Sequence, residues 1–491
     1  MDTANSDRLI AESEAKISSF DSQIENLQAL RAEEYQKIAV LKYLGSPIHV
    51  LPMEVLGEIF SFSIAPVRDR ATDLQENLNA IIPLSQVCRC WRQVALSTPR
   101  LWTELSITLE PYFGWAEIAW IASWLRRSMH LPLSVTIFAE ENHTNPAVLN
   151  EILLVKSRLT HLEIVIPATA FLPAIEPLFE APLDALQTLR ITEVNGESSW
   201  GEPINLSAFA PSLRTLILPK EVENTFFSNI PWSRLVHLQL LIGLPNEFIA
   251  VLRQCVNLER LDIGILAWDA IDDYPPQEMD LTLRNLRHMS ITVLFDTSDL
   301  GEFGPLFQPL VLPELTSLKI VYDKGVDVLW PQAEFSRFQS RCPSIQHLEI
   351  QVIKDLDEPR QLETITGFTF RSLILILRSS PALKSLTLLS FPHCIDDALL
   401  AALQYRASDE PLVPRLETLS WDGIGHGFEE SALEAMIRSR WRPAGQSPAA
   451  TSLLAVARLA NISIRCGEES PLSEPFIARM QDCIEDGNTL S

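Results

Sequence analysis

The feature that most constrains this chain is an aliphatic phrase that recurs from residue 159 onward. Its outline is L-x-x-L-x-L, as in LTHLEIVI, LERLDIG and LKSLTLL. Clear copies begin at 159, 186, 213, 235, 258, 286, 315, 345, 383 and 416, and a weaker one begins at 459. Alternating apolar positions predict a strand in each copy. Spacings of 22 to 38 residues between the clear copies predict a repeat array.

Apolar segments precede several of these strands and predict helices, as in NEFIAVLRQ, FSRFQSR and FRSLILILRS. One such unit cannot bury its apolar face alone, but stacked units share one core, and helices wider than strands force a curve. The array resembles irregular leucine-rich repeats. LTLLSFPHCIDDALLAAL is similar to their cysteine-containing kind, with Cys394 and Asp397 in the expected order. The resemblance implies a horseshoe whose strands line the concave side.

Two apolar segments between residues 46 and 105 predict short amphipathic helices. Pro52 opens the first and Pro83 the second, which we expect to run on until Pro99. Between them lies the insert APVRDRATDLQENLNAI, which we expect to bulge outward as a surface loop. Helices this short bury little surface by themselves, so this segment is expected to dock on another surface.

The order of residues in this segment resembles the F-box: Leu51-Pro52, Val55, Glu58-Ile59-Phe60, Leu84, Val87-Cys88, Trp91-Arg92 and Leu101-Trp102. F-box proteins use this motif to bind the Skp-type adaptor of a cullin-RING ubiquitin ligase, often with leucine-rich repeats behind it. The alternative is an ordinary helical cap on the domain that follows. The resemblance implies these adaptor-binding residues: Leu51, Pro52, Val55, Leu56, Ile59, Phe60, Leu84, Val87, Cys88 and Trp91.

Residues 7–44 carry a seven-residue apolar repeat that predicts a long helix. The first seam position holds Ile10, Ile17, Ile24 and Ile38, the second holds Phe20, Leu27 and Leu41, and Ser13, Arg31 and Glu34 interrupt them. Two outcomes remain open: a coiled-coil homodimer through residues 7–44, or a lone helix packed on the F-box.

Flanking segments complete the domain prediction. LSITLE and LPLSVTIF predict strands, and WAEIAWIASWLRRS between them predicts a helix whose tryptophan stripe belongs to the core, not to a ligand cage. EPFIARMQDCIED predicts one capping helix over the last repeat. The expected fold is α+β and multidomain: a coiled-coil-like helix (1–45), an all-α F-box domain (46–105), a linker with a capping segment (106–158), an α/β leucine-rich-repeat solenoid (159–466) and a capping helix with a tail (467–491).

Side chains that alternate with the buried strand positions should face the groove of the horseshoe. The predicted substrate-groove residues are His161, Glu163, Arg190, His237, Gln239, Arg260, Asp262, His288, Lys319, His347 and Glu349. At ~4.8 Å per strand the nearest histidines would be about 10 Å apart, too far to share a metal ion, and the cations would be about 10 to 15 Å apart. This spacing favours a mixed-charge protein surface over a metal site or a phosphate pocket.

Composition excludes several classes of partner. Lys and Arg number 39 against 63 Asp and Glu, a net charge of -24 that disfavours nucleic acid. No apolar run approaches the ~20 residues of a membrane span. Seven cysteines without a C-x-x-C pair predict reduced thiols in an intracellular protein, cytoplasmic, nuclear or both. We find no nucleophile motif, so we expect neither catalysis nor a cofactor.

These features favour a substrate-recognition subunit of an SCF-type ubiquitin ligase. In this role the F-box would bind the Skp-type adaptor and its cullin complex, and the repeats would bind a protein to be ubiquitinated. The alternative is a leucine-rich-repeat interaction scaffold that is not coupled to ubiquitination.

Overall fold

The computed structural model divides the chain into two compact units. Unit 1 comprises Met1–Thr103 and Arg126–Met129, and unit 2 comprises Glu104–Leu125 and His130–Ser491. The structure describes residues 3–45, 47–64, 74–109, 114–139, 146–166, 178, 182–193, 204–218, 227–242, 245–266, 280–294, 304–322, 330–353, 368–390, 394–406, 410–424, 427–441, 456–466, 472–485 and 487–490.

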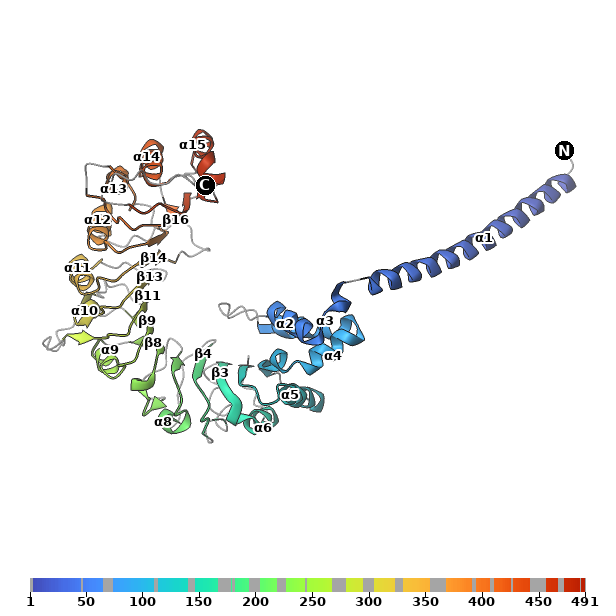
Figure 1. Ribbon diagram of the computed structural model, residues 1–491, viewed down its shortest axis with the longest axis horizontal. Coiled ribbons are helices and arrows are strands. Elements are labelled where there is room, and N and C mark those ends of the chain that lie inside the picture. Colours follow the sequence, from blue (N-terminus) through green and yellow to red (C-terminus); the bar gives the residue numbers. More distant parts are fainter. Residues whose placement is uncertain are drawn as a thin grey trace. The chain divides into compact units, whose positions relative to one another are not determined.

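Unit 1 is entirely helical within its described residues (Figure 1). Its elements are α1 (Thr3–Leu44), η1 (Pro47–Val50), α2 (Met53–Ser63), α3 (Leu74–Val87), α4 (Arg89–Ser97) and η2 (Pro99–Trp102). Pro52 directly precedes α2, and its carbonyl accepts the first helical hydrogen bond from Leu56 N at 3.1 Å. The predicted first helix is therefore present, with proline at its start.

The predicted second helix is wrong in its limits. Pro83 lies inside α3, and the backbone becomes extended at Cys88, where α4 begins. The Cys88 thiol accepts a hydrogen bond from Trp91 N at 3.4 Å and caps α4. A side chain that satisfies a free N–H group at a helix start makes such a break favourable. The apolar repeat that we interpreted as one helix therefore extends over two helices.

The predicted loop before Pro83 is also partly wrong. Residues 74–81 of the insert are helical, and Ile81 is buried. The remainder of the insert, residues 65–73, lies outside the described residues. Burial of Ile81 ties this part of the insert to the interior of unit 1.

Aromatic packing forms the small core of unit 1. The Phe60 and Trp91 rings lie 4.9 Å apart, and Trp102 donates its indole N–H to the Ala95 carbonyl oxygen at 2.8 Å. Gly57 allows α2 to approach the turn before η2, because an added Cβ would lie 2.9 Å from Thr98 Oγ1. These contacts connect α2, α4 and η2 around one interior.

Helix α1 does not pack on the F-box helices. Every described side chain between Arg8 and Lys42 is exposed. The helix is instead supported along its own surface, where Lys37 forms ion pairs with Glu33 at 3.0 Å and with Glu34 at 2.8 Å. The alternative of a lone helix packed on the F-box is therefore not what the structure has.

Unit 2 contains one parallel sheet of 14 strands in its described residues. In sheet order the strands are β1 (Glu104–Leu109), β2 (Leu133–Ala139), β3 (Leu159–Ile166), β4 (Thr188–Glu193), β6 (Thr215–Ile217), β8 (His237–Ile242), β9 (Arg260–Leu266), β11 (His288–Leu294), β13 (Ser317–Tyr322), β14 (His347–Val352), β15 (Ser385–Leu389), β16 (Thr418–Ile424), β17 (Asn461–Cys466) and β18 (Thr489–Leu490). Each repeated phrase, including the weak copy at 459, provides one strand, so the predicted solenoid is confirmed.

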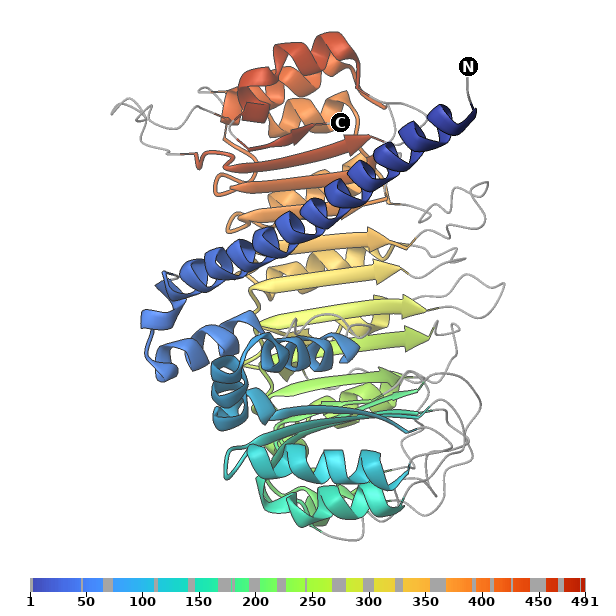
Figure 2. The same cartoon turned by 90° about the vertical axis from the view of Figure 1, so that its right-hand side faces the viewer.

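Helices cover one face of this sheet, and the strands line the inside of its curve (Figures 1 and 2). The helices of unit 2 are α5 (Trp115–Arg127), α6 (Pro146–Leu154), α8 (Leu206–Phe209), α9 (Pro245–Leu252), α10 (Gly304–Phe307), α11 (Gln332–Ser340), α12 (Phe370–Arg378), α13 (Asp397–Leu403), α14 (Glu430–Arg440), α15 (Glu474–Arg479) and α16 (Gln481–Glu485). Short 3₁₀ turns occur at η3 (Lys156–Arg158) and η5 (Trp232–Arg234), and two-stranded pairs form between β5 (Ile204–Asn205) and β7 (Phe227–Ser228) and between β10 (Leu281–Thr282) and β12 (Leu310–Val311).

The strand register places the aliphatic positions of neighbouring strands side by side across the sheet. Leu162 pairs with Leu189, and Leu238 pairs with Leu261, all fully buried. Strands β1 and β2 belong to the same sheet, so the array begins before residue 159. Within the preceding tryptophan stripe, Trp124 is buried, but Trp115 is 89% exposed and is not part of the core.

The C-terminal cap differs from the single helix that we predicted. The segment forms α15 and α16, which break at Met480, and β18 then pairs with β17. Phe476, Met480 and Cys483 are all buried, so the predicted apolar face covers the last repeats even though the helix is interrupted. None of the described helices is both long enough and apolar enough to cross a bilayer.

Arg440 connects the C-terminal repeats and gives a test of their packing. Its buried guanidinium donates to the carbonyl oxygens of Leu403, Val413 and Leu412. Burial lowers the pKa of Arg440 to about 10, so the side chain is still protonated at neutral pH.

We expect Arg440→Met to lower the free energy of unfolding by about 3 kcal/mol, because three buried carbonyl oxygens lose their donor. Arg337→Met on α11, an exposed position, is the matched control and should change stability by less than ~0.5 kcal/mol. Urea denaturation followed by circular dichroism measures both. Equal stability of the two variants would show that Arg440 is not a structural link.

Candidate functional site: the outer face of the F-box helices and the inner face of the sheet

Helix α2 has two apolar faces. Leu56, Gly57 and Phe60 are buried inside unit 1. Val55, Ile59 and Phe62 lie at i, i+4 and i+7 and therefore form a line on the opposite side of the helix. Their exposed fractions are 43%, 45% and 79%. A helix needs only one apolar face to fold onto its domain, so the second face is available for a partner.

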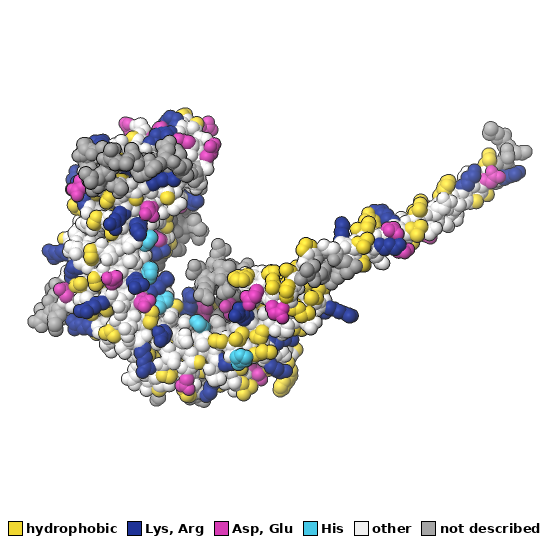
Figure 3. Space-filling model, viewed as in Figure 1, with side chains coloured by type: hydrophobic (Ala, Val, Ile, Leu, Met, Phe, Trp, Pro, Cys, Tyr) yellow, Lys and Arg dark blue, Asp and Glu magenta, His cyan; other side chains and the backbone are white. Residues whose placement is uncertain are grey.

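Other segments of unit 1 also expose apolar side chains. Leu51 precedes α2 and is 38% exposed, and Ile82 and Val87 on α3 are 44% and 59% exposed. We call the set of Leu51, Val55, Ile59, Phe62, Ile82 and Val87 the apolar patch. Figure 3 shows hydrophobic side chains gathered on the helices of unit 1.

The structure places the predicted adaptor-binding residues in three environments. Leu51, Pro52, Val55, Ile59 and Val87 are exposed, and Leu84, Cys88 and Trp91 are half-buried. Leu56 and Phe60 are 3% and 2% exposed, because the first packs inside unit 1 and the second packs on Trp91. Side chains this deeply buried offer no surface to an adaptor, so we leave these two out of the patch.

The prediction from sequence missed Phe62 and Ile82. Phe62 continues the spacing of Val55 and Ile59 by one more turn of α2, so the helical period alone could have identified it. Ile82 lies between the insert that we expected to be a loop and Pro83, where we expected the second helix to begin. Its place in a helix is a consequence of the register of α3, which the proline at position 83 concealed.

All of the predicted groove residues lie on the inner face of the sheet, in two rows that run across the strands. One row includes His161, His237, Arg260, His288 and His347. The other includes Glu163, Arg190, Gln239, Asp262, Lys319 and Glu349. Histidine side chains follow the face among acidic and basic ones (Figure 3).

Two cations of this face pair with acids on the neighbouring strand. Arg190 Nε lies 3.2 Å from Glu163 Oε1, and Lys319 Nζ lies 2.8 Å from Glu349 Oε1. Burial raises the pKa of Glu163, although Arg190 and a hydrogen bond from Thr136 oppose this effect. These described residues therefore form locally neutral pairs and not a cluster of cations around one phosphate group.

Asp262 is the centre of the most connected group on this face. Its Oδ2 atom lies 2.8 Å from His237 Nε2 and 3.0 Å from Arg260 Nε. Burial alone would raise the pKa of Asp262, but the hydrogen bonds and charges of His237 and Arg260 outweigh it, and the pKa is lowered. The carboxylate thus binds two side chains from two adjacent strands.

The histidines of this face are separated by intervening strands. Strand β9 lies between β8 and β11, and β13 lies between β11 and β14. At ~4.8 Å per strand, His237 and His288 are about 10 Å apart, as the sequence predicted. Across the described residues, no group of three or more His, Cys, Asp or Glu side chains could hold a metal ion.

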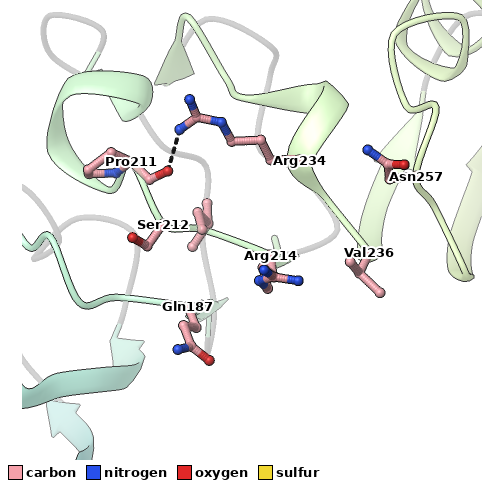
Figure 4. Close-up of a pocket in the computed structure, with 8 residues that line it drawn as sticks. Gln187, Pro211, Ser212, Arg214, Arg234, Val236 and Asn257 are labelled. Carbon is pink, nitrogen blue, oxygen red and sulfur yellow. Dashed lines mark hydrogen bonds between the residues drawn. The ribbon is translucent and has the colours of Figure 1, made fainter.

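A polar hollow of about 420 Å³ lies where β4, β6, β8 and β9 begin (Figure 4). Arg214 and Arg234 line it together with Gln187 and Asn257, none of which we predicted from sequence. Arg234 donates to the Pro211 carbonyl oxygen, and Asn257 donates to the Ser233 carbonyl oxygen at 2.7 Å. These two side chains hold successive turns together, which gives the lining a structural role.

Comparison with protein families matches residues 48–108 to the F-box-like family. No curated protein matches the chain. Among solved structures, the chain is similar to one in the crystal structure of the Rad7 and Elc1 complex in yeast, with 12% identity, a TM-score of 0.36 and coverage of 91% of this chain and 96% of that chain. It is also similar to one in the TLR13–ssRNA13 complex, with 15% identity, a TM-score of 0.25 and coverage of 63% and 48%.

Both TM-scores are below 0.5, too low to assign a shared fold. The chain has an F-box-like domain at residues 48–108, followed by a long parallel sheet of the leucine-rich-repeat kind. The resemblance that we drew from Leu51-Pro52 and the residues after it is confirmed at the level of the domain.

The Asp262 group gives a prediction for pH dependence. We expect Asp262→Asn to lower the free energy of unfolding by ~1 kcal/mol at pH 7, because two donors lose a charged acceptor. Since the folded-state pKa of Asp262 is lowered from its ordinary value, the stability that its carboxylate contributes is present above the unfolded pKa and is lost as pH falls through the folded pKa. Urea titrations of both proteins at pH 7 and pH 3 should show the difference shrinking; a difference independent of pH contradicts the assignment.

Proposed function

We propose that this protein is the substrate-recognition subunit of an SCF-type ubiquitin ligase. The apolar patch would bind a Skp-type adaptor, which connects the chain to a cullin complex. The inner face of the sheet would bind the protein to be ubiquitinated. The chain itself would perform no catalytic step and would need no cofactor, because ubiquitin transfer would take place on other subunits.

The observation that supports this proposal most strongly is the second apolar face of α2. Packing inside unit 1 explains why Leu56 and Phe60 are apolar. It does not explain the apolar side chains of Val55, Ile59 and Phe62, which are exposed to water. Exposed apolar side chains in a line on a short helix are typical of a surface that another protein covers. Their place inside an F-box-like domain indicates which partner that is.

The inner face of the sheet suits a folded or extended protein partner. Its 14 strands at ~4.8 Å give a surface about 65 Å long, ample for the ~800 Å² per partner of a specific interface. Its paired charges favour a partner with alternating acidic and basic groups over a nucleic acid, and the net charge of -24 points the same way. In this role the protein would act in the cytoplasm, the nucleus or both.

The alternative is an interaction scaffold whose F-box-like domain binds an adaptor outside any ligase. In both alternatives the apolar patch binds the adaptor. Only in the ligase does the adaptor also connect the chain to a cullin. Pull-down of the tagged full-length chain, followed by detection of cullin, separates the two. Adaptor without cullin supports the scaffold, and adaptor with cullin supports the ligase subunit.

Adaptor binding gives a direct test of the apolar patch. We expect Ile59→Asp to weaken binding of the purified Skp-type adaptor at least ~30-fold, because loss of a central apolar contact and burial of a charge together cost about 2 kcal/mol or more. Calorimetric titration of the full-length chain measures this change. Circular dichroism should show an unchanged fold, because Ile59 does not contribute to the interior of unit 1.

Leu375→Asp on α12 is the matched control. Leu375 is 46% exposed and Ile59 is 45% exposed, so the two changes introduce the same charge at equally accessible helical positions. The control should bind the adaptor as the wild type does. Undiminished binding by the Ile59 variant would refute the assignment of the patch.

A further inference from the structure

Helix α1 has a line of apolar side chains that no other described segment covers. Its members have exposed fractions of 45% to 68%: Ile10, Ile17, Phe20, Ile24, Leu27, Ile38 and Leu41. We propose that this line is covered by α1 of a second copy of the chain, in a parallel two-stranded coiled coil with both helices in register. The inference does not depend on the proposed function, because it uses none of the apolar patch.

The distribution of residue types along the line points to this form of pairing. The first seam position holds isoleucine four times, and the second holds Phe20, Leu27 and Leu41. β-Branched residues at the first position with leucine at the second favour two parallel strands over trimers or tetramers.

The period of the line supports a supercoil. The apolar residues repeat every seven positions over a helix of 42 residues. A straight helix lets such a line drift by ~20° per repeat, and a left-handed supercoil of two helices removes the drift. Seven side chains of about 100 Å² each bury roughly 700 Å² per chain, close to the ~800 Å² of a specific interface.

Charges on both sides of the line agree with a parallel arrangement in register. Lys16 would flank the seam opposite Asp21 of the second copy, an attractive pair. In register, Arg31 faces Arg31 and Glu34 faces Glu34 of the second copy, and each arginine also lies one layer from a glutamate of the other chain, which offsets these like-charge contacts. Lys37 would approach Lys42 of the second copy, but it is already held by Glu33 and Glu34 of its own helix.

An antiparallel arrangement with full overlap fits the same residues poorly. It sets Ile10 opposite Leu41, which places Glu34 against Ile17 and Arg31 against Phe20. Each charge would then be buried beside an apolar side chain without a partner, at a cost that the apolar layers must offset. In the parallel register each of these charges instead lies one layer from an opposite charge of the second copy, while the like-charge layers at positions 31 and 34 lower the affinity.

Light scattering on the full-length chain during size-exclusion chromatography tests the association. We expect twice the chain mass of 55.2 kDa for the wild type. Ile17→Glu with Ile24→Glu should raise the dissociation constant at least about 100-fold and give the monomer mass. Ser22→Glu with Ala29→Glu adds the same charge on the outer side of the helix and should leave the dimer intact. A monomeric wild type, or a dimer that survives both pairs of substitutions, overturns the proposal.

Cross-linking tests the orientation. Ser13 lies at a second seam position, and Ser13→Cys changes little else, so a parallel pair in register brings two thiols together at position 13. After mild oxidation, peptide mapping should find a disulfide that joins position 13 of two copies, and oxidised wild type should lack it. An intact dimer without this link overturns the parallel arrangement. Adaptor binding by the Ile17 and Ile24 variant is expected to be normal, so failure of this inference and failure of the proposed function are distinguishable.

Discussion

The architecture of unit 2 depends on the lateral stacking of parallel strands. No strand of six or seven residues can bury its aliphatic positions alone, but in register with its neighbours each leucine packs between two others. Leu162 and Leu189 show this on adjacent strands, and both are fully buried. The same register fixes the opposite face, since every second side chain must point into the groove. Burial on one side therefore determines which residues a partner can meet on the other.

This constraint explains why the inner face has many charged side chains but no strong excess of one charge at the paired positions. Register brings Glu163 beside Arg190 and Lys319 beside Glu349, so that charges are neutralised where they arise. Unit 1 differs from the sheet, because the side chains of its apolar patch are exposed to water and are not covered by other described residues of the unit. In the proposed function, polar recognition of a substrate would fall to the sheet, and apolar docking of an adaptor would fall to α2.

Much of the fold could be predicted from the sequence because an aliphatic period reports burial directly. The strand at each recurring phrase could be predicted. The position of alternate residues such as Lys319 on the face that points away from the core could be predicted too. The predicted helix limits are wrong where a local contact interrupts the repeat of apolar residues. Cys88 caps α4 and divides one apolar run into two helices, and Met480 marks a similar break near the C-terminus. A period also cannot tell which side of a doubly apolar helix is buried, which is why Leu56 and Phe60 were included among the adaptor-binding residues.

In the proposed function the apolar patch, and not the inner face of the sheet, would bind the adaptor. Hydrogen–deuterium exchange of the full-length chain with and without a purified Skp-type adaptor tests it most directly. We predict slower exchange in α2 and in residues 82–97, and unchanged exchange in β8, β9, β11, β13 and β14. Protection confined to those strands, or no protection in α2 at saturating adaptor, would contradict the account.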